Sequence, residues 1–97
     1  MRVRILNSAK HDLLAGYEFY EIQEDGLGEY FLTTLSGEIE SLANYAGIHR
    51  RRFESFLLLS KRFPYAIYYK IEGEIVTVHA ILDCRRDPLW LRRRFEG

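Results

Sequence analysis

The chain has 97 residues, of which 47% are hydrophobic and 29% are charged, and its formal net charge is zero. This length fits a single domain over residues 1–97, and the composition is that of a soluble globule rather than a disordered chain. The single cysteine excludes an internal disulfide, and no apolar run is long enough to span a membrane. Because the first residues also lack the pattern of a signal peptide, we expect the protein in the cytoplasm.

The first strand and two helices are predicted from local patterns. Apolar and basic residues alternate over 3–6, which predicts a short strand. Ser8 is expected to cap a following helix, with its hydroxyl accepting a hydrogen bond from a free amide of the first turn. Asp25-Gly26 ends that helix at about residue 24, because glycine enters the left-handed conformation without a Cβ penalty. A second helix over 27–46 carries apolar residues every three or four positions and completes an antiparallel hairpin.

The outer faces of these helices are expected to be acidic. Solvent-facing glutamates are predicted at Glu18, Glu21 and Glu24 in the first helix and at Glu29, Glu38 and Glu40 in the second. Gly37 weakens the second helix and is expected to allow a close helix crossing.

Three strands are predicted after the hairpin, over 56–60, 65–71 and 74–84, and a basic connection over 49–53 precedes them. The last of these strands is expected to lie centrally in the sheet, because both of its faces are largely apolar. Its predicted faces are Val76, Val78, Ala80 and Leu82 on one side, and Ile75, Thr77, His79 and Ile81 on the other.

A short C-terminal helix is predicted from Pro88 to about Phe95. Asp87 is the expected N-cap, and proline suits the first helical position because its missing amide would be unpaired there. The three arginines 92–94 suit the negative end of the helix dipole. They point in different directions around the helix, so at least one is expected to pack against the acidic helices. The predicted fold is α+β, with the element order β-α-α-β-β-β-α.

The charges are divided unevenly along the chain. Residues 1–48 carry three basic and eight acidic side chains, whereas residues 49–97 carry eleven basic and six acidic ones. A polyanionic partner of the basic half would explain this asymmetry. Attraction between the two halves of one fold would explain it as well, because net charge governs association rather than fold. The sequence leaves both explanations open.

Three stretches carry a resemblance to a known group of proteins. "SAKHDLLAGYEFYE" is similar to a first helix, "GLGEYFLTTL" to the start of a second, and "LLLSKRFPYAIYYKIEGEIVTVHAILDCRRDP" to the sheet of the RelE/ParE superfamily. This superfamily comprises toxins of bacterial type II toxin–antitoxin systems. The resemblance covers nearly the whole chain and lies nearer to the ParE side.

The resemblance implies a mainly antiparallel sheet with the helical hairpin packed on one side. It also implies a cytoplasmic toxin, with no cofactor or metal, that is bound by a cognate antitoxin whose disordered tail folds over it. ParE-like members act in plasmid stabilization and inhibit growth by poisoning DNA gyrase. RelE-like members enter the ribosome and cut mRNA.

The resemblance also indicates the residues that would contact the target. Basic residues stand before the third of the family's strands and after its last strand, and aromatic and basic residues follow on the C-terminal helix. In this chain the expected target-binding residues are Lys61, Arg62, Arg85, Arg86, Trp90 and Arg93. If the protein is a nuclease, Arg62, Arg85 and Arg86 would clamp the phosphate.

Two departures from the cleaving relatives favour binding over catalysis. Many of those relatives have a histidine before the basic pair, where this chain has Asp83-Cys84, and they end in a tyrosine that is absent here. Metal-free RNA cleavage requires groups that accept and donate protons, and arginine is a poor base. A gyrase poison is therefore the first prediction. A ribosome-dependent mRNA endonuclease is the alternative, and a non-toxic nucleic-acid-binding protein of the same fold is the second alternative.

The remaining candidate groups have ordinary structural explanations. Cys84 stands beside two arginines that would favour its thiolate, but it also fits an ordinary strand-end cysteine. His79 is expected to be a hydrogen-bonded sheet residue rather than a base. His11 and His49 lack the spacing of a zinc site with Cys84. The tyrosines 65, 68 and 69 alternate across a strand, so at least one could line a binding groove.

Overall fold

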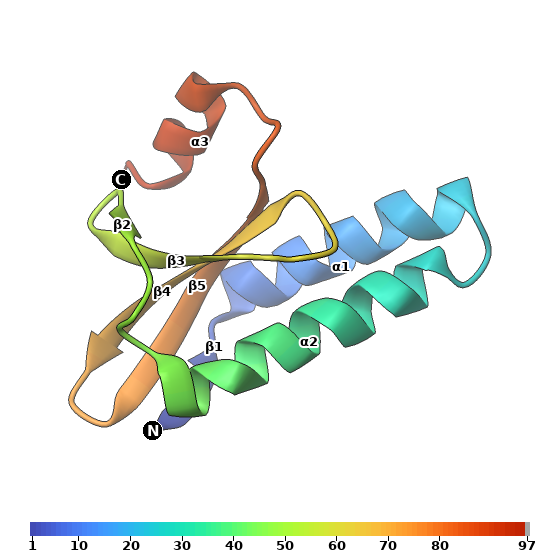
Figure 1. Cartoon of the computed structure of the whole chain (residues 1–97). Coiled ribbons are helices and arrows are strands. Elements are labelled where there is room, and N and C mark those ends of the chain that lie inside the picture. The colour runs from blue at the N-terminus through green and yellow to red at the C-terminus, as the bar shows by residue number, and fades with distance from the viewer. Residues whose placement is uncertain (97) are drawn as a thin grey trace.

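The computed structural model describes residues 1–96. A sheet lies between a helical hairpin on one face and a short C-terminal helix on the other (Figure 1). The elements in chain order are β1 (Arg2–Ile5), α1 (Asn7–Gln23), α2 (Leu27–Tyr45), β2 (Arg51–Arg52), β3 (Ser55–Leu59), β4 (Tyr65–Glu72), β5 (Ile75–Asp83) and α3 (Pro88–Arg94). The predicted α+β fold is confirmed, with one addition: the basic connection contains the two-residue strand β2.

The sheet has five strands in the order β1-β5-β4-β3-β2. Only the β1–β5 pair is parallel, so the sheet is mainly antiparallel. Strand β5 lies between β1 and β4, as its two apolar faces predicted. None of the helices in the described part of the chain is long and apolar enough to cross a membrane.

The two helices of the hairpin meet in close contact at Gly16 and Gly28 rather than at Gly37. A Cβ atom on Gly16 would lie 2.5 Å from Cζ of Phe31, and one on Gly28 would lie 2.6 Å from the carbonyl oxygen of Tyr17. A Cβ atom on Gly37 would meet nothing within 4 Å, so the predicted crossing at Gly37 is wrong. The apolar stripe turns the opposite side of α2 toward the core, which leaves Gly37 exposed.

Two of the six glutamates predicted to face solvent instead satisfy backbone amides. The carboxylate of Glu21 accepts hydrogen bonds from the amides of Gly26, at 3.0 Å, and Gly28, at 2.9 Å. Oε2 of Glu38 accepts a hydrogen bond from the amide of Lys61, at 2.9 Å. Because the first amides of a helix and of a loop need acceptors, a nearby carboxylate is drawn to them. The other four glutamates are exposed as predicted.

An extra residue in β5 changes the side to which its side chains point. Tyr68 of β4 pairs with Ala80, but the next residue, Tyr69, pairs with Val78, so His79 has no partner across the strand pair. This arrangement is a β-bulge, in which two residues of one strand face one residue of the other.

The bulge makes the predicted faces of β5 wrong. Val76 and Val78 belong to the core beneath the hairpin, whereas Ala80 and Leu82 belong to a second core on the opposite face of the sheet. Ile81 returns to the hairpin side. Side chains alternate between the two faces of a strand only while the strand pairing is regular. One inserted residue reverses this alternation.

The N-terminal part of α1 supplies hydrogen bonds to β5 where β1 has ended. The amide of Leu6 donates to the carbonyl of Val78, at 3.0 Å, and the Ser8 hydroxyl donates to the carbonyl of His79, at 2.9 Å. The predicted helix-capping role of Ser8 is therefore wrong, since the N-cap is Leu6 and makes no side-chain hydrogen bond. Beyond the end of β1, the backbone carbonyls of β5 on that side have no strand partner, and the Ser8 hydroxyl provides a hydrogen bond to one of them.

The C-terminal helix starts as predicted and covers the second core. The Asp87 side chain accepts a hydrogen bond from the amide of Leu89, at 2.8 Å, and Pro88 occupies the first helical position. Leu91 is buried on the sheet, and the Phe95 ring lies 4.8 Å from the ring of Tyr68. Few side chains attach α3 to the sheet, so each of them matters for its position.

Candidate functional site

The first strand-end arginine, Arg85, forms a two-point ion pair. Its Nε lies 3.0 Å from Oδ1 of Asp83, and its Nη2 lies 2.8 Å from Oδ2. The Arg85 hydrogen bond is the main reason that the pKa of the Asp83 carboxyl lies below its usual value. Arg85 therefore presents a largely neutralised pair at the end of β5, not an isolated positive charge.

Two tyrosines beside this ion pair remain neutral. Burial, with a further contribution from Asp83, raises the pKa of Tyr65 to about 12. Burial also raises the pKa of Tyr20, which lies near Arg85. Neither hydroxyl can act as a base near neutral pH.

The second strand-end arginine, Arg86, stacks on Trp90. The Arg86 guanidinium carbon lies 4.4 Å from the centroid of the indole ring. Both residues are exposed, and Arg86 makes no ion pair with any carboxylate among residues 1–96. A cation over an aromatic face gives a surface that is both charged and flat.

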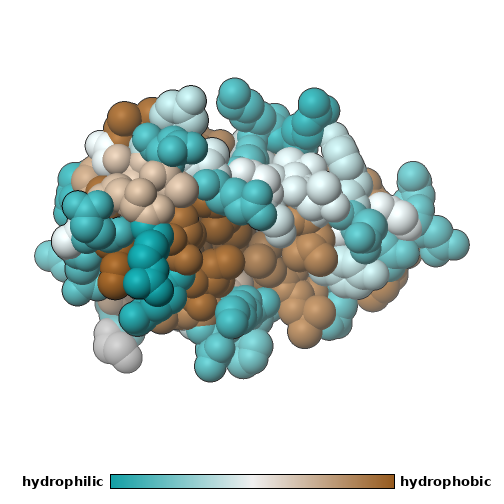
Figure 2. Space-filling view, turned by 90° about the horizontal axis from the view of Figure 1, so that it is seen from below, coloured by the Kyte–Doolittle hydropathy of each residue, from teal (hydrophilic) through white to brown (hydrophobic). Residues whose placement is uncertain are grey.

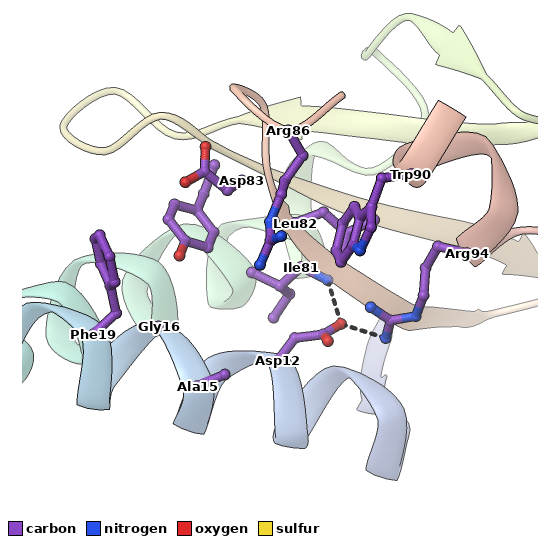
Figure 3. Close-up of a pocket in the computed structure, with 11 residues that line it drawn as sticks. Asp12, Ala15, Gly16, Phe19, Ile81, Leu82, Asp83, Arg86, Trp90 and Arg94 are labelled. Atoms are coloured by element: carbon purple, nitrogen blue, oxygen red, sulfur yellow. Dashed lines mark hydrogen bonds and ion pairs between the residues drawn. The ribbon is translucent and has the colours of Figure 1, made fainter. Parts of the chain in front are cut away.

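Arg86 and Trp90 line a groove of about 380 Å³ between α1, the end of β5 and α3 (Figure 3). The remaining lining residues are Asp12, Ala15, Gly16, Phe19, Tyr65, Ile81, Leu82, Asp83 and Arg94. The prediction that one of the three tyrosines lines a groove is consistent with the position of Tyr65. Tyr68 and Tyr69 are buried in the two cores.

Asp12 holds the three sides of the groove together. Its Oδ2 accepts a hydrogen bond from the Ile81 amide, at 3.0 Å, and from Nη2 of Arg94, at 2.7 Å (Figure 3). Arg94 is thus the arginine of the C-terminal run that packs against an acidic helix, as expected. Arg92 and Arg93 are exposed in the last turn of α3.

Lys61 and Arg62 lie outside this groove. Both follow β3, where the Lys61 amide is bound to Glu38 of α2. The Arg62 guanidinium donates a hydrogen bond to the Tyr30 hydroxyl, at 3.0 Å. The structure therefore brings together Arg86 and Trp90, with Arg85 alongside, but separates them from the basic residues over α2. Arg93 does not line the groove either.

Asp12 and Phe19 are groove residues that sequence reasoning missed. Asp12 follows Ala9 by three positions and precedes Gly16 by four, so it lies on the buried face of α1. A charged residue on an apolar helix face needs a partner. That signal was present in the sequence, although the sequence could not show which partner it would find.

The other titratable candidates have structural partners. Nε2 of His79 lies 2.9 Å from Oγ of Ser55, which confirms that His79 is a hydrogen-bonded sheet residue. Nδ1 of His49 bonds the Tyr69 hydroxyl. Desolvation of the sulfur, with a contribution from Asp83, raises the pKa of the Cys84 thiol, which disfavours the thiolate. Residues 1–96 contain no group of three side chains placed to hold a metal ion.

Residues 3–88 match the family model described as "ParE toxin of type II toxin-antitoxin system, parDE". The chain belongs to this ParE toxin family. The match ends at Pro88, so Trp90 and Arg94 of this ParE-family toxin lie beyond the matched residues. The groove is therefore built partly from the family's common region and partly from α3.

A solved structure from P. aeruginosa, titled "Chromosomal ParDE TA system", is similar to the ParE-family toxin described here. The TM-score is 0.74 at 20% sequence identity, and the match covers 84% of this chain and 92% of that chain. At this identity the likeness shows the fold alone. No curated protein matches the chain.

Proposed function

We propose that this protein inhibits bacterial growth by binding DNA gyrase and trapping it on cleaved DNA, and that a cognate antitoxin neutralises it. Membership of the ParE toxin family supports a toxin with an antitoxin partner. The observation that carries the choice of a binding mechanism is the exposed Arg86–Trp90 stack at the mouth of the groove.

This stack has the properties of a binding surface. Tryptophan and arginine contribute most often to the energetically important centres of protein interfaces. Arg86 directly follows the ion-paired Arg85, and Asp87 caps the helix that carries Trp90. These contacts restrain the backbone that carries both side chains, and such restraint lowers the entropy lost when a partner binds.

The side chains of the groove do not favour RNA cleavage. Its tyrosine, Tyr65, has a high pKa, and no imidazole lines the groove. His79, the histidine of β5, lies on the opposite face of the sheet, bonded to Ser55. A protein that acts by surface binding fits this arrangement better than an endonuclease that uses the strand-end arginines.

The surface of the hairpin supports a docking place for the antitoxin. A second groove, of about 390 Å³, lies between α1 and α2 and is lined by Leu13, Leu14, Tyr17 and Leu32, with Lys10 and Glu29 at its edges. Leu14 is 54% exposed. Figure 2 shows hydrophobic residues gathered in a band across one face of the molecule, bordered by hydrophilic residues. An amphipathic segment that folds on binding could cover such a surface.

The gyrase proposal is tested with purified protein, gyrase and supercoiled plasmid. The wild-type chain should cause linear plasmid to accumulate after denaturation of trapped complexes. The double variant Arg85→Ala/Arg86→Ala and the single variant Trp90→Ala should lose this effect while keeping the wild-type circular dichroism spectrum. Arg92→Ala is the matched control, because Arg92 is an exposed arginine of α3 outside the groove. Full trapping by the folded double variant would contradict the proposal.

A parallel reaction with ribosomes and mRNA distinguishes the nuclease alternative. Cleavage that appears only on ribosomes, without trapping of gyrase, would replace the gyrase proposal. For the antitoxin, Leu14→Asp should weaken binding of the protein encoded beside the toxin, measured by calorimetry, because it places a charge in the apolar groove. Trapping of gyrase should remain in this variant.

A further inference from the structure

A recess of about 500 Å³, distinct from the two grooves described above, lies on the open face of the sheet beside α3 and away from the hairpin. Four strands and the C-terminal helix contribute to it. The residues that matter most for its chemistry are Arg4, Ser55, Lys70, Thr77, His79 and Phe95. None of them lines the groove of Arg86 and Trp90. Arg94 lines both hollows, but the six residues named here belong to the recess alone.

The floor of this recess is polar. Ser55 and Thr77, 1% and 8% exposed, are the two buried polar residues among residues 1–96. The bulge in β5 turns His79 toward Ser55, whose hydroxyl it meets at 2.9 Å. The part of the same sheet face under Leu91 is apolar, built from residues such as Ala80 and Leu82. The buried Ser55 hydroxyl has its hydrogen-bond partner in His79, so this polar floor is satisfied within the fold.

Two cations flank the central hydroxyl of the floor. Arg4 of β1 and Lys70 of β4 are both directly opposite Thr77 of β5 in the strand register. Neighbouring strands lie about 4.8 Å apart, so the side chains of Arg4 and Lys70 lie on opposite sides of Thr77. Neither cation has a carboxylate within 4 Å in the described part of the chain. An anion between them would relieve their repulsion and would accept hydrogen bonds from both.

Carboxylates are also present at the edge of the recess. Glu54 and Glu72 line it together with a third cation, Arg94, which is already paired with Asp12. The lining residues therefore give only a small excess of positive charge. An anion would be selected by the placement of Arg4, Thr77 and Lys70 rather than by a general positive field.

Two partly buried aromatic rings, packed against the second core, adjoin the cations. The rings of Phe53 and Phe95 stack at a centroid distance of 4.8 Å and an interplanar angle of 22°, and the Arg52 guanidinium lies 4.7 Å from the Phe53 centroid. Aromatic rings beside cations are the elements with which proteins hold single-stranded nucleic acid, because the bases stack while the phosphates bind the cations. In a duplex the bases are not free to stack on such a surface.

The turn that holds Phe53 is strained. Phe53 and Glu54 have φ values of 55° and 62°, in the left-handed region that glycine and asparagine occupy at low cost. Each such residue costs about 1–2 kcal/mol. Backbone strain of this kind occurs preferentially at functional sites. Here it places Phe53 on Phe95 and Glu54 at the edge of the recess.

We infer that this recess binds single-stranded nucleic acid, with one phosphate held between Arg4 and Lys70 above the Thr77 hydroxyl and a neighbouring base against the exposed parts of the Phe53 and Phe95 side chains. The inference does not rest on the gyrase proposal, because the two sites share no target-contacting residue.

The test measures fluorescence anisotropy of labelled ten-nucleotide single strands of RNA and DNA, and of a duplex of the same length. Single strands should bind more tightly than the duplex. The variant Arg4→Gln/Lys70→Gln should weaken their binding at least tenfold and should reduce the slope of log K against log salt by about 0.7, since the contact with one phosphate is lost. Lys10→Gln, an exposed cation of α1, should bind like the wild type.

A second measurement shows whether the ligand enters the recess. The NMR signals of the His79 ring should shift when a single strand is added to the wild type and should not shift with the double variant. Equal affinity of the folded double variant and the wild type, or equal binding of the duplex, would overturn the inference. Complete displacement of the oligonucleotide by 1 mM phosphate, about the scale of weak anion binding, would show a small-anion site instead.

Discussion

The carboxylate of Asp12 and the guanidinium of Arg94 form an ion pair, with an Nη2–Oδ2 distance of 2.7 Å, that ties the first helix to the last. The same Oδ2 atom accepts the Ile81 amide of β5. One atom of α1 therefore sets the position of both the strand and the helix that form the Arg86–Trp90 groove. Both side chains of the pair are mostly buried, with 28% and 13% of the Arg94 and Asp12 side chains exposed.

Replacement of Asp12 by alanine should lower the free energy of unfolding by about 2 kcal/mol, because it leaves a strand amide and a mostly buried guanidinium without their acceptor. Asp12→Asn should cost less, since its amide oxygen still accepts from Ile81. Urea denaturation at pH 7 measures both. Glu18→Gln, an exposed change on the same helix, should alter the free energy of unfolding by less than about 0.5 kcal/mol. A similar loss in all three variants would refute the special role of Asp12.

Two glycine-to-alanine changes in the hairpin should have opposite effects. Gly16→Ala should destabilise the protein by about 1–3 kcal/mol, because its Cβ would lie 2.5 Å from the Phe31 ring. Gly37→Ala should stabilise it by about 1 kcal/mol, since the new methyl group meets nothing within 4 Å and alanine favours the helix. The melting temperatures of both variants, compared with that of the wild type, test these two predictions. A destabilising Gly37→Ala would show that α2 tolerates no side chain there.

Stability should fall as the pH is lowered below about 6.5, partly because of His79. Burial, followed by the charges of Lys70 and Arg94, holds the pKa of the His79 imidazole below its ordinary value of 6.5. The unfolded chain therefore binds a proton first as the pH falls, and the folded state loses stability from pH 6.5 down to the folded pKa. Burial also lowers the pKa of His49, so His49 contributes to the same loss of stability at low pH.

The variant His79→Gln tests the contribution of His79, because its amide can still reach Ser55 but does not titrate. Urea midpoints at several pH values between 5 and 8 should show a smaller dependence on pH than the wild type. His11→Gln, at an exposed position, should leave the dependence unchanged. An unchanged dependence in His79→Gln would assign the effect to His49 or to carboxylates.

Replacement of Glu54 by glycine should stabilise the protein by about 1 kcal/mol, because glycine removes the strain of a positive φ value. Glu54→Ala is the control, since alanine removes the same carboxylate but keeps the unfavourable backbone conformation. Chemical denaturation of the two variants separates the backbone from the side chain. If alanine stabilises the protein as much as glycine does, the carboxylate rather than the turn is unfavourable.

Local patterns in the sequence predicted the helices, the strands and the start of α3 closely. The apolar periodicity of residues 27–46 matches α2, and Asp87-Pro88 opens α3 as expected. The site was only partly predictable. Arg86 and Trp90 were expected to contact a target and do share a groove, whereas Lys61, Arg62 and Arg93 lie elsewhere. The residues that the family resemblance groups as target-binding therefore do not all lie together on the surface.

The sequence by itself therefore determined the element order, because helix and strand periods and cap residues act over a few neighbouring positions. Only the tertiary structure decided the faces of β5 and the position of α3. The bulge at His79 depends on how β4 pairs with β5, and Asp12 meets Ile81 and Arg94 across 69 and 82 positions of the chain. Such contacts depend on which unsatisfied groups meet once the elements pack, and no local pattern specifies that meeting.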